Sequence, residues 1–272
     1  MTNFSISAAW EETKALLARD GRLFASVALA LIVLPAVVAG VFDPRAAGEV
    51  DAPRWFNAVV LIVSLISMAG QLALIRLALA PSITVAGAMS HGFSRLPLYV
   101  VALIVLGLGA MLLSIPFAIA AIALGLDIEQ DASAMAITGP LILLVLLLVL
   151  FFLFVAVRFL MSMPVASAER AGPISMLKRS WELTSGHWLK LFGFLLVALF
   201  TAVLILGAVS MVVGSLILIL FGSAEPMSVA ALFGAIIEGV LTGIFSVLFT
   251  LMLTRIYVQL SGRDRVEDAH SS

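Results

Sequence analysis

Six long apolar stretches dominate the pattern of hydrophobic and polar positions along the chain. A helix needs about 20 predominantly apolar residues to cross a hydrocarbon core of about 30 Å, and each stretch is long enough. The pattern therefore predicts an all-α polytopic membrane protein with six transmembrane helices. The stretches cover residues 23–42, 58–80, 98–124, 137–159, 189–221 and 230–257.

The fifth stretch is longer than one crossing requires. Its 33 residues would form a helix of about 50 Å, which is too short for two crossings. Tilt, a bend near Gly207 or Gly214, or an extension beyond the bilayer would accommodate the excess length. We also expect kinks at Pro35 and Pro116, which lie inside the first and third stretches, because neighbouring helices can satisfy the carbonyls that proline leaves free.

The lysines and arginines are distributed unequally between the two sides of this layout. The side that carries both termini has thirteen of the fifteen positive residues, and the other side has only Arg45 and Arg54. By the positive-inside rule, both termini are expected to be cytoplasmic. Glu11, Glu12 and Asp20 precede an apolar run of about 20 residues, which favours a retained first span over a cleaved signal peptide.

Composition agrees with the membrane class. Of the 272 residues, 63% are hydrophobic and only 11% are charged, with a mean hydropathy of +1.22, whereas about a quarter of a soluble domain is charged. The net charge of −1 excludes the strongly basic footprint of nucleic-acid binding, so no nucleic-acid partner is expected. Because the chain has no cysteine, disulfides and thiolate metal sites are also excluded.

The even-numbered spans end in similar sequences, IRLALAP, VRFLMSMP and TRIYVQL. This similarity places Arg76, Arg158 and Arg255 near the same end of each span. A long arginine side chain at such a depth can extend to the lipid headgroups. We therefore expect three interfacial arginines.

A mixed segment precedes each odd-numbered span, near residues 5–19, 81–95 and 173–187. In each segment, apolar or near-apolar positions are spaced by 3, 4 and 3 residues, which marks one face of a helix. The sequence thus predicts three repeats of an in-plane amphipathic helix and a transmembrane hairpin over 1–260, followed by a polar tail over 261–272. Unrelated amphipathic flanks remain the alternative. The spaced positions are Ile6, Ala9, Thr13 and Leu16; Ile83, Ala86, Ser90 and Phe93; and Ile174, Leu177, Trp181 and Thr184.

The third mixed segment has the clearest interfacial character. Lys178 and Glu182 are spaced for an i,i+4 ion pair, and Trp181 and Trp188 suit the aromatic belt at the headgroups. Lys178 and Arg179 are expected to face the cytoplasm or anionic lipid, each with about 1 kcal/mol of attraction to a charged surface.

The run VRFLMSMPVASAERAGPISMLKRSWELTSGHWLKLFGFLLV, which begins at Val157, resembles the signature segment of the glycerophosphoryl diester phosphodiesterase membrane domain family. In that family, an arginine near a helix end, a proline, a Glu-x-x-Gly/Pro turn and a Ser-Trp-x-Leu-Thr-x-Gly run occur in this order. The matching residues are Arg158, Pro164, Glu169, Gly172, Pro173, Ser180, Trp181, Leu183, Thr184 and Gly186.

This resemblance implies a membrane module rather than an enzyme. The family includes bacterial cytoplasmic (inner) membrane proteins of unknown function, and its catalytic activity lies in a separate soluble barrel that some members carry. Only 15 residues follow the last predicted span, so no catalytic residue is carried over to this chain.

The positions of the potentially reactive residues also predict a protein that is not an enzyme. His91, His187 and His270 fall in different segments, and no nucleophile elbow, phosphate loop or zinc-binding helix motif is present. The acids at 127, 129 and 131 are oxygen donors that could bind a divalent cation, but alternating acids in a short loop are usually solvated. We expect no catalytic site, no metal and no cofactor.

Glu238 lies nine residues into the sixth stretch, where a charge is costly unless it is hydrated, protonated or paired. Beside it, Ala235, Gly239 and Gly243 form a small-residue face that allows close helix contact. Gln71 in the second stretch is the candidate polar partner. Either a proton or substrate site within the bundle or a structural carboxyl group would explain this acid.

These observations predict a non-catalytic integral membrane module that associates with membrane lipids, assembles with a protein partner or forms a homo-oligomer. The alternative is a transporter or lipid-translocating protein that uses a buried Glu238, because transporter repeats place polar groups near the membrane midplane. An enzyme working at the membrane surface comes third.

Overall fold

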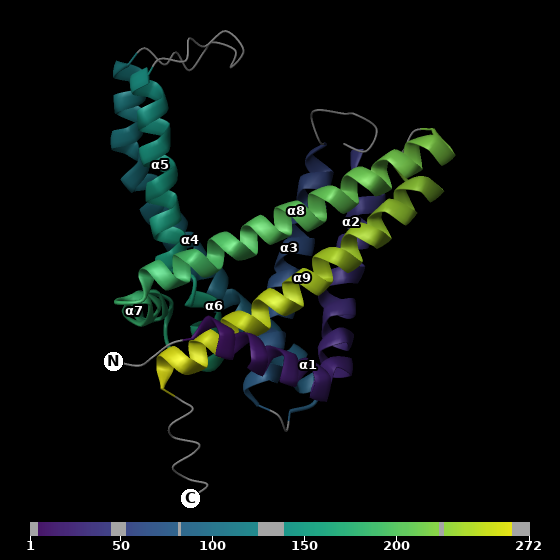
Figure 1. Cartoon of the computed structure of the whole chain (residues 1–272), viewed down its shortest axis with the longest axis horizontal. Helices are drawn as coiled ribbons and strands as arrows, with labels where there is room; N and C mark the ends of the chain where they lie inside the picture. Colours follow the sequence, from purple (N-terminus) through teal and green to yellow (C-terminus); the bar gives the residue numbers. More distant parts are fainter. Residues whose placement is uncertain (1–4, 45–52, 81–82, 125–138, 223–225, 263–272) are drawn as a thin grey trace, which may run out of the picture.

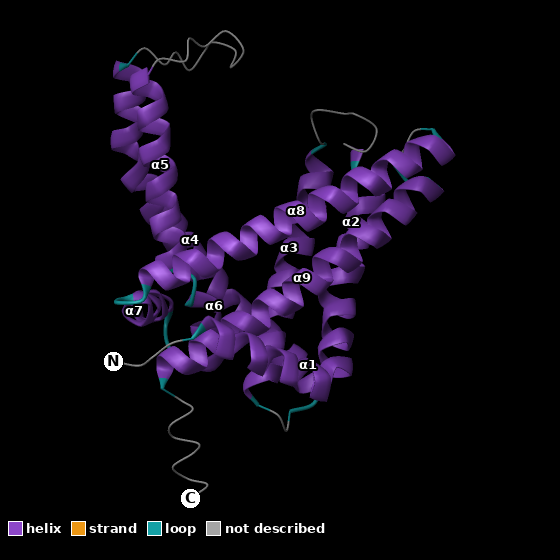
Figure 2. Cartoon of the chain, viewed as in Figure 1, coloured by secondary structure: helices purple, strands orange, loops and turns teal. Residues whose placement is uncertain are grey.

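The computed structural model describes residues 5–44, 53–80, 83–124, 139–222 and 226–262, which contain helices and turns but no strand (Figure 2). Six helical segments are long and apolar enough to cross a membrane, and we call them the first to sixth spans. The predicted all-α class with six transmembrane helices is therefore confirmed.

The first span contains α1 (Ile6–Ala28), the π-helical turn η1 (Leu29–Val33) and α2 (Leu34–Val41). The second and third spans are α3 (Arg54–Leu79) and α4 (Val85–Ala123). The fourth span is divided into α5 (Gly139–Arg158) and α6 (Ser162–Ala168), and the short helix α7 (Pro173–Thr184) follows it. The fifth and sixth spans are α8 (Trp188–Phe221) and α9 (Val229–Ser261).

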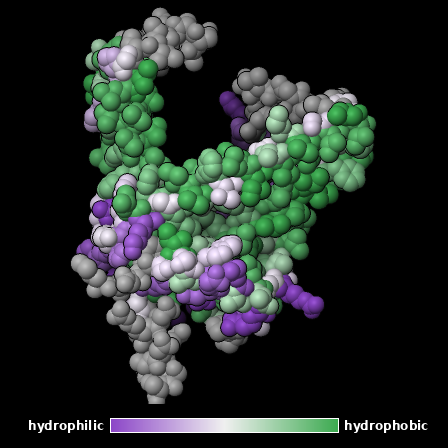
Figure 3. Space-filling view, in the orientation of Figure 1, coloured by the Kyte–Doolittle hydropathy of each residue, from purple (hydrophilic) through white to green (hydrophobic). Residues whose placement is uncertain are grey.

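α3 is the central helix and packs against α4, α6, α9 and the first span. The α4–α5 hairpin projects away from the rest of the body, while α8 and α9 run side by side (Figure 1). Apolar residues cover these four helices, and hydrophilic residues gather around α7 and the start of α1 (Figure 3). The start of α1 also meets the end of α9, where the Ser5 amide donates to Gln259 Oε1 at 3.1 Å. We call the region that contains α7, the start of α1 and the end of α9 the α7 end.

The first amphipathic segment is a distinct arm of α1. Asp20 has non-helical dihedral angles (φ −122°, ψ 17°), which separate this arm from the span. Of the predicted apolar face, Ala9, Thr13 and Leu16 are buried in the protein and Ile6 is half-buried.

Proline affects the spans in different ways. The π-helical turn from Leu29 to Val33 lies just before Pro35. Because the proline ring crowds the carbonyl four residues earlier, a wider turn at this point accommodates it. The third span instead stays helical through Pro116, and α8 continues without interruption through Gly207 and Gly214.

The second amphipathic segment does not form a separate helix, because α4 continues without a break into the third span. The side of this segment that packs against the protein is not the predicted apolar face: Ala88 and Gly92 are buried, whereas Ala86, Ser90 and Phe93 are exposed. The small residues pack directly on α3, so size rather than hydrophobicity selects the face that is buried.

The third segment is a separate helix, α7, and only part of its predicted apolar face packs against the protein. Leu177 and Thr184 are buried, while Ile174 and Trp181 are exposed. Met176, Ser180 and Leu183 complete the buried side. α7 therefore presents both apolar and small polar residues to the protein interior, whereas its tryptophan stays on the exposed side.

Candidate interfacial site

The fourth span is interrupted near the α7 end. Pro164 has no amide hydrogen for the Leu160 carbonyl, and its ring crowds that carbonyl, so a regular helix is disfavoured there. At the break, the Ser162 amide donates to Phe159 at 3.0 Å. The Arg158 carbonyl consequently loses its usual donor in the helix.

Two hydroxyl groups of α7 replace that donor. Ser180 Oγ donates to the Arg158 carbonyl oxygen at 3.0 Å, and Thr184 Oγ1 lies 3.2 Å from the same oxygen. The single Thr184 hydroxyl is shared with the Ser180 and Trp181 carbonyl oxygens of α7 itself, at 3.0 and 3.1 Å. Both hydroxyl side chains are fully buried. The Ser-Trp-x-Leu-Thr run thus holds α7 against the broken end of α5.

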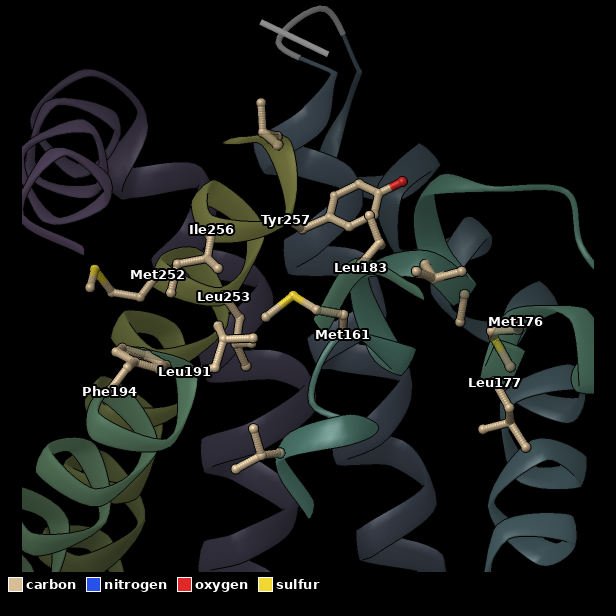
Figure 4. Packing of buried hydrophobic residues seen from close by; sticks show 14 of the residues in the cluster. Met161, Met176, Leu177, Leu183, Leu191, Phe194, Met252, Leu253, Ile256 and Tyr257 are labelled. Atoms are coloured by element: carbon tan, nitrogen blue, oxygen red, sulfur yellow. The ribbon is translucent and has the colours of Figure 1, made fainter. Parts of the chain in front are cut away.

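The residues packed beneath the contact between α7 and the end of α5 are apolar. Met161, which lies in the break, packs among Leu253 and Tyr257 of α9 and Leu183 of α7 (Figure 4). Tyr257 is fully buried, and its hydroxyl donates to Glu169 Oε1 at 2.7 Å. The break in the fourth span is therefore fixed by contacts with both α7 and α9.

The Arg158 side chain lies between two aromatic rings. Its Cζ is 5.2 Å from the centre of the Phe154 ring and 4.6 Å from that of Trp181. Nη1 donates to Ser185 Oγ at 3.0 Å. No carboxylate in the described part of the chain forms an ion pair with this guanidinium.

An aromatic cluster continues from Arg158 onto α8. Trp188 lies 6.0 Å from Phe154 and stacks on Phe192 at 5.1 Å between ring centres. Phe159 lies 5.9 Å from Trp181. The structure thus brings together Arg158, Trp181 and Trp188, which the sequence analysis selected separately as interfacial residues.

Arg179 differs from Arg158 because acids balance its charge. Its Nε is 3.5 Å from Glu169 Oε1, and its Nη1 is 3.6 Å from Glu182 Oε2. The predicted ion pair of Lys178 with Glu182 is wrong. Arg179 lies between Glu169 and Glu182 and pairs with Glu182 instead. Lys178 is exposed and forms no ion pair with a described residue.

The other two span-terminal arginines lie near the end of α3. Arg255 Nη2 donates to the Ala78 carbonyl at 3.3 Å, among the last carbonyls of α3, which lack partners within the helix. Arg76 belongs to the last turn of the same helix. The Nε atoms of both arginines are buried without a hydrogen-bond partner in the described part of the chain.

The two intramembrane polar candidates do not meet. Glu238 lines a crevice of about 120 Å³ between α8 and α9, together with Ser210 and Gly214. Gln71 lines a different cavity, bounded by α3, α4, α5 and α9. Glu238 is exposed at this crevice, a position that suits the structural carboxyl group better than a site within the bundle.

The small-residue face beside Glu238 explains this outcome. Ala235, Gly239 and Gly243 are buried, and a Cβ built on Gly239 would lie only 2.8 Å from Val37 Cγ2 of the first span. The predicted close helix contact is confirmed. Because α9 turns this face toward the first span, the neighbouring Glu238 side chain is directed to the α8 side.

The two described histidines lie in different parts of the fold. His91 Nε2 lies 3.0 Å from the Ser167 carbonyl oxygen, and His187 lies in the turn before α8. His270 and the acids at 127, 129 and 131 are outside the described residues. Within the described ranges, no group of three or more histidine, aspartate or glutamate residues is arranged to hold a metal ion.

A family model described as "Domain of unknown function (DUF7847)" matches residues 5–260. This match includes all six spans, the break in the fourth span and α7. Comparisons with curated proteins and with solved structures find no match.

Proposed function

The chain belongs to the family of the domain of unknown function DUF7847, and we propose that it is a non-catalytic membrane module that binds anionic phospholipid headgroups. One observation carries this proposal: the Arg158 guanidinium is held between Phe154 and Trp181 without a carboxylate partner in the described part of the chain. At headgroup depth, lipid phosphate supplies the missing anion, and the planar guanidinium suits its oxygens.

The geometry around Arg158 supports such a contact. Stacking on two rings contributes about 0.5–1 kcal/mol per cation–π contact and limits the side chain to one direction. Nη1 is used by Ser185, whereas Nη2 donates no hydrogen bond to a described residue. Trp181 is 41% exposed, as expected of an indole that lies among headgroups.

The proposal includes an orientation, with α7 and both termini on the cytoplasmic side of a bacterial inner membrane. Because the chain has no cysteine, single replacements can test it. Lys178→Cys in α7 should not react with an impermeant maleimide added to intact cells, whereas Arg54→Cys at the start of α3 should. Both should react after permeabilisation. Labelling of Lys178→Cys in intact cells would reverse the orientation.

Replacement of Arg158 tests the headgroup site. Arg158→Gln should weaken binding of fluorescent phosphatidylglycerol to the purified chain by about tenfold, because a charge-assisted hydrogen bond contributes about 1.5–3 kcal/mol and 1.4 kcal/mol is a factor of ten. The fold should persist, because Ser180 and Thr184 bind the Arg158 backbone rather than its side chain.

Lys178→Gln is the matched control for this test, because it removes one positive charge from the same region outside the aromatic cluster. It should weaken binding by less than about fivefold, in line with about 1 kcal/mol for a surface charge. Equal affinities for the wild type and Arg158→Gln would disprove the site. An equal loss in both variants would mean that only net charge matters.

A further inference from the structure

A cavity of about 300 Å³ lies where α3, α4, α9 and the broken fourth span meet. Arg158 does not line it, so the cavity is separate from the proposed headgroup site. Its walls are mainly apolar and include Leu103 and Leu106 of α4, Val155 and Phe159 beside the break, and Leu253 of α9. None of the described residues that line the cavity is charged.

Four uncharged polar side chains are among the residues that line this cavity: Gln71, Tyr99, Ser162 and Thr250. Tyr99, Ser162 and Thr250 are buried, and the Tyr99 and Ser162 side chains lie near each other. The half-buried Gln71 amide forms no hydrogen bond with a described residue. An amide left unpaired in an apolar environment is destabilising, and a ligand that forms a hydrogen bond with it would offset this cost.

These features define the chemistry of a ligand. The absence of charge around the cavity disfavours phosphate or ammonium groups, because a buried ion without a partner is costly. The Gln71 amide can both donate and accept a hydrogen bond, which suits a hydroxyl or an ester carbonyl. The apolar walls suit acyl chains. A neutral lipid with a small polar end satisfies all three conditions.

The depth of Gln71 agrees with this chemistry. It precedes Arg76 by five residues, or about 7.5 Å along α3. If Arg76 reaches the headgroups, Gln71 lies just below them, where the ester groups of one leaflet are found. We propose that this cavity binds a neutral acylglycerol such as diacylglycerol, with its hydroxyl or ester on the Gln71 amide and its acyl chains along α4 and α5.

A photoactivatable, clickable diacylglycerol tests this site on the full chain in phosphatidylcholine nanodiscs. Gln71→Leu should lower labelling by at least about fivefold, because it removes the amide but keeps a side chain of similar length. Ala156→Phe should lower labelling by a similar factor, because Ala156 is exposed to the cavity and an aromatic ring would occupy it. Excess unlabelled diacylglycerol should compete with the probe.

Ala198→Phe is the matched control, because Ala198 lines a different groove between α1, α8 and α9. It should leave labelling unchanged. Unchanged labelling in both Gln71→Leu and Ala156→Phe would overturn the inference, and so would phosphatidylglycerol that competes as well as diacylglycerol. Arg158→Gln should not affect this labelling, so failure of the headgroup site and failure of the cavity can be distinguished.

Discussion

Replacement of Gly92 by alanine is expected to destabilise the folded protein strongly. Gly92 is buried where α4 crosses α3, and a Cβ built there would overlap the Ala69 carbonyl oxygen. The same Cβ would stand 3.1 Å from the amide nitrogen and from the Cβ of Ala73. Backbone atoms cannot rotate away as a flexible side chain can, so the two helices would have to separate.

The expected cost lies at the upper end of the range for overpacking, about 3 kcal/mol. For a chain of this size, such a loss lowers the Tm by roughly 6–12 °C. Thermal unfolding in detergent and the monodisperse fraction in size-exclusion chromatography measure this effect. The α3–α4 contact involves the central helix, so aggregation of the unfolded chain should accompany the lower Tm.

Gly107→Ala provides the control on the same helix. A Cβ at Gly107 meets no atom within 4 Å, and alanine has a higher helix propensity than glycine by about 1 kcal/mol. This variant should be as stable as the wild type or slightly more stable. If Gly92→Ala has the same Tm as Gly107→Ala, the tight α3–α4 packing is contradicted.

The number and approximate position of the six spans follow from the sequence for a simple physical reason. Crossing a bilayer requires a certain length and an apolar composition, and a single segment reveals both. The buried faces do not follow as easily, because residues that face lipid are as apolar as those in the core. Leu72 of α3 is fully buried, whereas Leu146 of α5 is 52% exposed, and hydropathy cannot distinguish them.

The intramembrane polar candidates show a second limit of the sequence. Counting residues gives the depth of Glu238 along α9, but not the direction of its side chain around the helix axis. That direction is set by the small face packed against the first span. Gln71 was selected as a partner for Glu238, but the cavity that contains it is built from four segments far apart in the sequence.

The motif that carries the family resemblance acquires structural roles in the fold. Glu169 accepts a hydrogen bond from Tyr257, Leu183 enters the core, and Gly186 turns the chain toward α8 with a φ of 84°. These contacts join residues of α9 and α7 to the broken fourth span. Sequence alone identified the motif residues, but only their tertiary contacts explain their spacing.

The double replacement Ser180→Ala, Thr184→Val is expected to release α7 from the broken end of α5. It removes both hydroxyl donors from the Arg158 carbonyl oxygen, which remains buried without a partner. An unsatisfied buried group of this kind costs about 1–3 kcal/mol. Because valine has nearly the shape of threonine, most of the effect should come from hydrogen bonding rather than packing.

The single variants make this prediction sharper. Either Ser180→Ala or Thr184→Val leaves one hydroxyl on the carbonyl, so each should cost much less than half of the double replacement. This departure from additivity is expected when two groups share one partner. Ser175→Ala is the control on the same helix, because its exposed hydroxyl only donates to the Gly172 carbonyl at 2.8 Å, and its effect should stay within about 0.5 kcal/mol.

Hydrogen exchange of the α7 amides and the fluorescence of Trp181 provide direct measures of this release. In the double variant, exchange across α7 should accelerate and the Trp181 ring should lose its contact with Arg158, while exchange in the core of α3 changes little. The Arg158 side chain is held by Trp181 of α7. Phosphatidylglycerol binding should therefore weaken when α7 is released from the end of α5. If the effects of the two single variants add up to that of the double variant, the two hydroxyl groups do not share the Arg158 carbonyl. If the double variant binds phosphatidylglycerol normally although α7 is released, the headgroup site does not depend on the contact between α7 and α5.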